Sequence, residues 1–493
     1  MPDPDNTAVP GALHTDLYQL TMAQAYWHAG ISDTDACFHL TFRANPFGGG
    51  FALAAGLEPA LAYLEALMFS QDDLSYLATV PGADGAPIFA AGFLEWLASF
   101  RFTCDVDAVA EGTVVFATAP LMRVTGPIVQ CQVVETAILN SVNFQTLVAT
   151  KAARVCIAAG GDPVIEFGLR RAQGPDGGLS ASRAAYIGGC TGTSNVRAGR
   201  HFGIPVAGTH AHSWVMAFDS ELEAFEAYAD ALPNNCTFLV DTYDSLDGVR
   251  RAVEAGRRLR DRGYEFVGIR IDSGDLAWLS RRAREILDEG GFPGARIVAS
   301  NELDEHLIRS LKDQGAAIDV WGVGTRLATA WDQPALGGVY KLSAIRRPGE
   351  EWIPRIKLSE QTAKVTTPGL LGVRRYVRDG ALAGDMVYDV RIPPDGEAVM
   401  VDASDSTRRK VFAASDTFID LLEPAFRDGT RVCACPELSE VRARAAEQVA
   451  ALDPTVKRFL NPHTYPVGLE TGLNDIRNQL VRRARNLDEG EGI

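Results

Sequence analysis

The feature that most constrains the fold is an alternation, between residues 163 and 325, of short apolar runs and helix-like stretches. The runs are "PVIEFG" (163–168), "IPVAGT" (204–209), "CTFLVDT" (236–242), "FVGIRIDSGD" (266–275), "RIVAS" (296–300) and "IDVWGVGT" (318–325). Continuous β-branched runs indicate strands buried on both faces, and the helices between them indicate parallel crossovers. We therefore predict an α/β fold with an irregular (β/α) barrel over residues 131–340. An open doubly wound sheet is the alternative, but no G-x-G-x-x-G fingerprint follows the first strand.

The flanking sequence has a different character. The 493 residues suffice for two or three domains. A helix-like start and alternating segments near 110–130 predict an N-terminal α/β sandwich domain over residues 1–130, completed by about 340–390. Turn-rich segments followed by helical sequence predict a small C-terminal β-rich and helical region over residues 390–493.

Composition excludes some classes of function. The net charge of −16 disfavours a diffuse nucleic-acid binder. No apolar run reaches the ~18 residues that a membrane helix needs, and the acidic, Pro-rich start differs from a signal peptide, so we expect a cytoplasmic protein. Of the eight cysteines only Cys433 and Cys435 are close. No second pair stands at zinc spacing, and the sequence assigns these two no role.

Polar residues gather where the predicted strands end, which is where parallel barrels carry their chemistry. These residues are Phe167, Gly168, Arg170 and Arg171; Thr209, His210 and His212; Asp241, Thr242 and Asp244; Arg270, Asp272, Ser273, Gly274 and Asp275; Asn301; and Gly322, Gly324 and Thr325. Glycine and threonine let backbone N–H groups approach a phosphate, and arginines pair with anions. Asp272 and Asp275 are spaced for sugar hydroxyls or a hydrated Mg²⁺. The set predicts a site for a phosphorylated sugar.

The doublet His210 and His212 has three interpretations. An H-x-H pair at a strand end is typical of metal-dependent hydrolases, but no other histidine follows a predicted strand. One ring bonded to backbone would be structural. A nucleophilic or basic histidine needs an orienting carboxylate, and Asp241 at the next strand end is the natural candidate.

Ordered motifs across nearly the whole chain resemble the nicotinate phosphoribosyltransferase family. They are "TDLYQLTMAQAYW", "FRANPFGGGFALAAGL", "EFGLRRAQGPDGGLSASRAAYIGG", "GTHAHSW", "VDTYDS", "IRIDSGDL", "GVGT", "LGGVYKL" and "RIKLSEQTAKVTTPG". The resemblance implies an enzyme of NAD salvage. Its members join nicotinate to 5-phosphoribosyl-1-diphosphate (PRPP), giving nicotinate mononucleotide and diphosphate, with coupled ATP hydrolysis and Mg²⁺.

The resemblance also implies a role for each matching residue. His212 becomes phosphorylated by ATP, with Asp241 fixing its tautomer. Phe167 stacks on the pyridine ring, and Tyr18 covers the other face from the partner subunit of a homodimer. The remaining residues bind substrate. Arg170 faces the nicotinate carboxylate or the PRPP phosphates, Thr209 lines the base site, and Arg270 and Asp272 hold ribose and diphosphate. The 5-phosphate is cradled by Gly322, Gly324, Thr325, Gly337 and Gly338, and the phosphates are also reached by Lys357, Lys364 and Thr366.

Three alternatives remain at this point. Nicotinamide-using relatives carry an aspartate in the loop that here reads "GTSNVRAG", where Ser194 and Asn195 stand instead. A carboxylate there would repel nicotinate, so the sequence favours the acid. A metal-dependent hydrolase built on His210 and His212 would hold zinc. A silent sugar-phosphate binder would lack His212, Arg270 or Asp272, and all three are present.

Overall fold

The computed structural model describes residues 9–359 and 365–485 of a mixed α/β protein. The chain divides into two compact units. The first consists of the residues up to Leu147 together with those from Ala335 onward, and the second of Val148–Pro334. Lys364 lies outside the described residues.

The second unit is built on a parallel sheet of six strands in the order β7-β6-β11-β10-β9-β8. Every neighbouring pair in it is parallel, as the apolar runs predict. The strands are β6 (Val164–Glu166), β7 (Gly192–Thr193), β8 (Thr237–Leu239), β9 (Gly268–Ile271), β10 (Arg296–Ala299) and β11 (Val320–Val323).

The sheet is a half-barrel, and one predicted strand is absent from it. The run 204–209 forms only a bridge at Val206 to Thr193 of the edge strand β7. Thr193 donates to the Pro205 carbonyl at 3.0 Å and accepts from Ala207 at 3.0 Å, and the pairing stops there. Proline has no N–H to extend a ladder. The prediction of a strand over 204–209 was therefore wrong, and the two-residue β7 was not anticipated.

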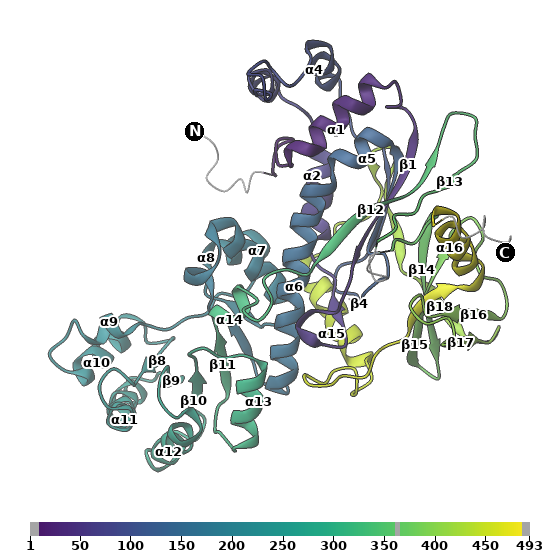
Figure 1. Ribbon diagram of the computed structural model, residues 1–493. Helices are drawn as coiled ribbons and strands as arrows, with labels where there is room; N and C mark the ends of the chain where they lie inside the picture. Colours follow the sequence, from purple (N-terminus) through teal and green to yellow (C-terminus); the bar gives the residue numbers. More distant parts are fainter. Residues whose placement is uncertain (1–8, 360–364, 486–493) are drawn as a thin grey trace. The chain divides into compact units, whose positions relative to one another are not determined.

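Helices follow these strands and begin close to the strand ends (Figure 1). Aspartates cap three of them: Asp244 accepts from Asp247 N–H, Asp275 from Trp278 N–H, and Asp304 from Leu307 N–H. These helices are α11 (Ser245–Asp261), α12 (Leu276–Glu289) and α13 (Glu305–Asp313). The others are α6 (Glu135–Ala159), which begins in the first unit, η2 (Leu169–Arg171), α7 (Gly174–Ile187), α8 (Val196–Phe202), α9 (His212–Val215), α10 (Glu221–Ala231) and α14 (Thr325–Ala328).

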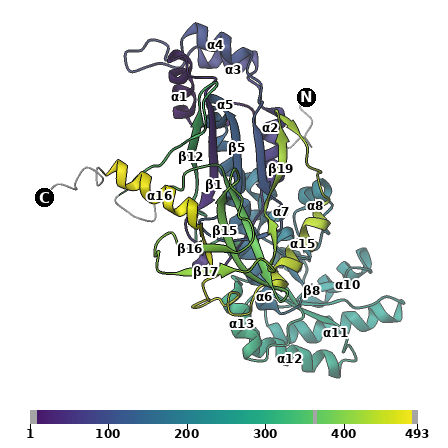
Figure 2. The same cartoon turned by 90° about the vertical axis from the view of Figure 1, so that its right-hand side faces the viewer.

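The first unit contains a seven-stranded sheet in the order β13-β12-β1-β5-β3-β19-β20. Its centre is antiparallel, with β1 between β12 and β5 (Figures 1 and 2). Chain from beyond residue 335 therefore completes a sheet that begins near the N-terminus. The strands are β1 (Asp35–Phe42), β3 (Asp105–Val109), β5 (Met122–Pro127), β12 (Gly338–Arg346), β13 (Ile353–Pro354), β19 (Leu422–Arg427) and β20 (Thr430–Arg431).

A second sheet of this unit has the order β17-β16-β21-β15-β14-β18, and β2 (Ala52–Leu53) pairs with β4 (Val114–Val115). The buried Arg375 pairs with Asp385 at 2.7 Å inside it. Its strands are β14 (Leu371–Arg378), β15 (Ala381–Asp389), β16 (Ala398–Val401), β17 (Arg409–Phe412), β18 (Thr417–Asp420) and β21 (Val467–Glu470).

The helices of the first unit are α1 (Leu17–His28), η1 (Pro46–Gly48), α2 (Leu57–Ala66), α3 (Gln71–Leu77), α4 (Ala91–Ala98), α5 (Ile128–Val133), α15 (Leu438–Ala451) and α16 (Thr471–Ala484). The described part of the chain contains no helix with both the length and the apolar character that crossing a membrane requires.

Candidate active site

The centre of the site is the guanidinium of Arg270, near the end of β9 in the second unit. Its Nε donates to Ser300 Oγ at 2.8 Å, Nη1 to Thr209 Oγ1 at 3.1 Å, and Nη2 to Asp272 Oδ1 at 2.9 Å. Its carbon lies 5.4 Å from the centroid of the Phe167 ring. Side chains from four strand-end segments are thus brought together, as the topology predicts.

Two carboxylates stand beside this arginine. Asp241 follows β8, and its side chain is only 1% exposed. Its Oδ2 accepts from Asp272 N–H at 3.0 Å and from Ser273 Oγ at 2.6 Å. Its Oδ1 is buried without a hydrogen-bond partner among the described residues. A buried carboxylate oxygen in this state is costly, so it calls for a donor supplied when the site is filled.

His212 faces both carboxylates. It begins α9, and its side chain is 40% exposed. Nε2 lies 4.0 Å from Asp241 Oδ1 and 3.9 Å from Asp272 Oδ2, while Nδ1 lies 3.2 Å from Thr242 Oγ1. A ring between two carboxylates and a hydroxyl is both oriented and open to a reactant.

His210 has a different role, although it is only two residues away. The ring is buried and its Nε2 accepts the Leu239 N–H at 3.2 Å. Tyr228 packs against it with centroids 5.0 Å apart. Burial lowers the pKa of His210 to about 4, so the ring is neutral near pH 7. Its lone pair is occupied by backbone, which favours the structural interpretation and argues against an H-x-H metal pair.

Phe167 follows β6 and is seated by a glycine of the neighbouring strand. Gly322 lies in β11, where an added Cβ would stand 2.6 Å from Phe167 Cε2. The side chain of Glu166, just before, is buried and accepts from the Gly168 N–H, from Ser182 Oγ at 2.9 Å and from Thr193 Oγ1 at 2.6 Å. Gly322 thus accommodates the ring, and Glu166 fixes the turn that carries it.

The segments that follow β11 and β10 are joined by a hydrogen bond. Gly324 precedes the first residue of α14, and Thr325 Oγ1 donates to Glu302 at 3.3 Å. Asn301 and Glu302 have φ angles of 93° and 42°, a conformation that non-glycine residues rarely adopt. Such consecutive outliers occur where a site constrains the backbone.

Two predicted residues lie away from this cluster's contacts. Arg170 is exposed on η2. Asp275 Oδ1 accepts the Trp278 N–H at 3.0 Å as the cap of α12. The structure therefore shows Asp275 as a helix cap, and its metal role stays a prediction.

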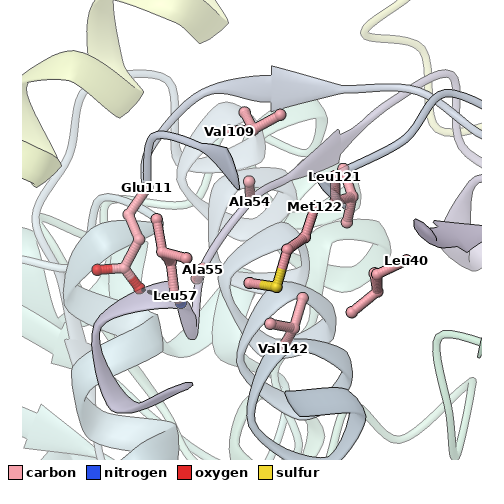
Figure 3. A pocket seen from close by; sticks show the side chains of 9 residues that line it. All are labelled: Leu40, Ala54, Ala55, Leu57, Val109, Glu111, Leu121, Met122 and Val142. Atoms are coloured by element: carbon pink, nitrogen blue, oxygen red, sulfur yellow. Dashed lines mark hydrogen bonds between the residues drawn. The ribbon is translucent and has the colours of Figure 1, made fainter. Parts of the chain in front are cut away.

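A separate pocket lies in the first unit and contains no predicted site residue. Figure 3 shows its walls, which are apolar apart from Glu111. That carboxylate already accepts from the N–H groups of Gly56 at 2.6 Å and Leu57 at 3.1 Å, at the start of α2. The lining is Leu40, Ala54, Ala55, Leu57, Val109, Glu111, Leu121, Met122 and Val142.

Comparison with known proteins identifies the family. Profiles of the nicotinate phosphoribosyltransferase N-terminal domain, family and C-terminal domain match residues 13–143, 163–353 and 373–477. A Bacillus subtilis protein named nicotinate phosphoribosyltransferase is 43% identical, covering 97% of each chain. A protein of that name from Caenorhabditis elegans is 38% identical, covering 94% of this chain and 92% of its own. The crystal structure of human nicotinic acid phosphoribosyltransferase matches with a TM-score of 0.83, 32% identity, and coverage of 94% and 99%.

The chain belongs to the nicotinate phosphoribosyltransferase family.

Several residues that the family resemblance singles out lie in the first unit. Tyr18 is 49% exposed on α1. Gly337 has a φ of 77°, and Gly338 packs so closely that a Cβ would stand 2.1 Å from Asn143 Oδ1. Lys357 N–H donates to Thr366 Oγ1 at 2.9 Å.

Sequence reasoning left three residues of the cluster without a role. Ser300 bonds both Arg270 and Asp272, Thr242 contacts His212, and Ser273 donates to Asp241. Each directly follows or lies near the end of a predicted strand. Thr242 and Ser273 were already named as strand-end residues, and a hydroxyl at such a position is the signal that would have indicated Ser300 as well.

Proposed function

We propose that this chain joins nicotinate to PRPP, giving nicotinate mononucleotide and diphosphate, as an ATP-coupled enzyme of NAD salvage. The observation that carries the proposal is the grouping of Phe167, His212, Asp241, Arg270 and Asp272 at the strand ends of one unit. The names of relatives matched over almost their full length support it.

The chemistry asks mainly for positioning and charge stabilisation. The pyridine nitrogen attacks C1 of the ribose as the C1–O bond to diphosphate breaks. That nitrogen carries no proton, so no general base is needed. Phe167 stacks on the ring, which contributes about 1 kcal/mol beyond area burial. Arg270 and Asp272 hold ribose and diphosphate, Thr209 lines the base site, and Arg170 meets an anionic group of either substrate.

The phosphates would lie at two sets of backbone and cationic groups. In this proposal Gly322, Gly324 and Thr325, with Gly337 and Gly338, cradle the 5-phosphate. Lys357, Lys364 and Thr366 would reach the phosphates from the segment 355–369.

The carboxylates fit a magnesium ion. Asp272 keeps Oδ2 outside its bonds to Arg270 and Ser300, and Mg²⁺ typically takes one or two carboxylates together with phosphate oxygens and water. Asp272 would hold it, with Asp275 contributing through water or phosphate. The ion would neutralise charge on the leaving diphosphate.

His212 is the proposed site of phosphorylation. A ring nitrogen attacks the γ-phosphorus of ATP, ADP leaves, and water later cleaves the P–N bond to release phosphate. Asp241 Oδ1, buried and 4.0 Å from Nε2, stabilises the ring's charge and tautomer. Incubation with γ-labelled ATP should label the wild-type chain and leave His212→Ala unlabelled. Label retained on His212→Ala would refute the assignment.

The acid substrate is preferred over the amide for an electrostatic reason. Asn195 is buried and uses its side chain to cap α8 and to bond Gly178 and Ser182. The nearby Glu166 is saturated by three donors. No carboxylate of this loop is therefore available to accept an amide N–H or to repel nicotinate. Nicotinamide phosphoribosyltransferase activity is the second candidate, because it needs the same ring and sugar contacts.

The family resemblance is also the basis for proposals about the oligomeric state and the domain arrangement. We propose a cytoplasmic homodimer in which Tyr18 of one subunit covers the base bound by the other. We also propose that the half-barrel is completed as an irregular barrel, beside an N-terminal α/β sandwich and a small C-terminal region.

The experiment that tests the function is direct. Purified chain is incubated with nicotinate, PRPP and Mg²⁺, with and without ATP, and nicotinate mononucleotide is separated by chromatography. Product is expected, in greater yield with ATP. No product in either mixture would refute the proposal.

A further inference from the structure

Ser300 makes two bonds whose direction is dictated by its partners. It directly follows β10 and is 3% exposed. Its Oγ accepts from Arg270 Nε at 2.8 Å and also contacts Asp272 Oδ1. Arginine remains protonated and can only donate, so the one hydroxyl proton of Ser300 must go to the carboxylate. The serine hydroxyl therefore bridges the two groups: it accepts a hydrogen bond from Arg270 and donates one to Asp272.

The two bonds to Asp272 fix the orientation of its carboxylate. Oδ1 of Asp272 receives both the Ser300 hydroxyl and Nη2 of Arg270. Oδ2 is left to face His212, whose Nε2 lies 3.9 Å away. Without the serine, one of the two bonds that fix the plane of the Asp272 carboxylate is lost.

The same serine fixes the plane of the guanidinium. Thr209 and Asp272 hold the two terminal nitrogens, and Ser300 holds Nε. Three anchors fix an otherwise flexible side chain, which then presents one face to the Phe167 ring. Removing the Nε anchor releases rotation about the last side-chain bonds while the charge remains.

We propose that Ser300 is a positioning residue for PRPP, holding Arg270 and Asp272 as one rigid pair with Asp272 Oδ2 turned toward the substrate. This inference rests on the proposed function. A positioning role predicts that loss of Ser300 raises the KM for PRPP. A smaller fraction of folded enzyme would instead lower the apparent kcat and leave KM unchanged.

The test compares matched serine variants. Ser300→Ala is expected to raise the KM for PRPP on the order of tenfold, the effect of losing one hydrogen bond to a charged group. KM for nicotinate should change much less. Ser300→Thr keeps the hydroxyl and should lie near wild type. The control is Ser280→Ala, because Ser280 is also buried in this unit but bonds only the backbone of Ala277 and Ala317.

Titration of each variant with PRPP in a calorimeter gives a second readout that needs no turnover. Should Ser300→Ala not fold, Ser300→Cys fills the same place with a weak donor, and the same loss of affinity is expected. Unchanged PRPP affinity in the folded variant would overturn the inference, as would equal defects in Ser300→Ala and Ser300→Thr. Failure of the wild-type enzyme to form product would instead refute the proposed function.

Discussion

At the residue scale, the two histidines of "THAH" show how local geometry separates identical side chains. His210 points into the protein and accepts a backbone N–H, whereas His212 is 40% exposed and faces two carboxylates. The motif alone left the three interpretations open. The Leu239 bond decides His210, because it occupies the nitrogen lone pair that a metal would need.

Neutral, buried His210 should make stability depend on pH. Its pKa of about 4 lies below the usual 6.5, so the unfolded chain takes up the proton first as pH falls. The contribution is present above pH 6.5 and is lost as pH falls through about 4, amounting to on the order of 3 kcal/mol. His210→Gln keeps an acceptor but does not titrate. Urea unfolding at several pH values should therefore show a shallower pH dependence in this variant, and identical slopes would contradict the assignment.

The absence of a side chain at Gly322 should determine the position of the Phe167 ring. A methyl group there would stand 2.6 Å from the ring and displace it. In Gly322→Ala we expect the KM for nicotinate to rise about fivefold, which is the loss of roughly 1 kcal/mol of stacking. Gly294→Ala is the matched control, because an added Cβ at Gly294 meets nothing within 4 Å. Equal nicotinate KM values in the two variants would exclude this role for Gly322.

At the element scale, aspartates at helix starts stabilise the fold, and one of them is also proposed to take part in metal binding. Asp275 caps α12, so Asp275→Ala should lower the free energy of unfolding by about 1 kcal/mol. Asparagine caps equally well but is a poor magnesium ligand. Asp275→Asn should thus keep its stability while requiring more Mg²⁺ for half-maximal activity. If thermal unfolding and Mg²⁺ titration found neither effect in these variants, the cap and the metal role would both be rejected.

The elements show what sequence pattern can predict. Apolar runs placed β6, β8, β9, β10 and β11 correctly, because a buried parallel strand needs apolar side chains on both faces. The run 204–209 has the same composition but pairs only at Thr193, and Pro205 supplies no N–H. An apolar pattern predicts which side chains are buried, but it does not predict which backbone N–H and C=O groups form hydrogen bonds with a neighbouring strand.

At the scale of the whole molecule, sequence reasoning predicted which residues would lie together but not how they would bond. Strand-end position selected Arg270, Asp272 and Asp241, since topology alone brings such ends together. The link through Ser300 depends on side-chain rotamers that no pattern encodes. The pairing of β12 with β1 joins residues about 300 apart and was anticipated only as a completion of the N-terminal domain.

The proposed sharing of the site between two subunits can be tested by mixing variants. Tyr18→Ala and Phe167→Ala should each lose most of their activity as separate preparations at low nicotinate, because each loses the buried area of its ring as well as the stacking. Unfolding and refolding them together should restore roughly a quarter of wild-type activity, because half of the dimers are mixed and each mixed dimer holds one intact site. Activity no greater than the sum of the separate variants would mean that Tyr18 acts within its own subunit or not at all.

The most direct test of the central claim is a competition between the two bases. Wild-type chain receives equal nicotinate and nicotinamide with PRPP, ATP and Mg²⁺, and both mononucleotides and diphosphate are measured over time. Nicotinate mononucleotide should be the dominant product, with an equal amount of diphosphate. Dominant nicotinamide mononucleotide, or neither mononucleotide, would contradict it.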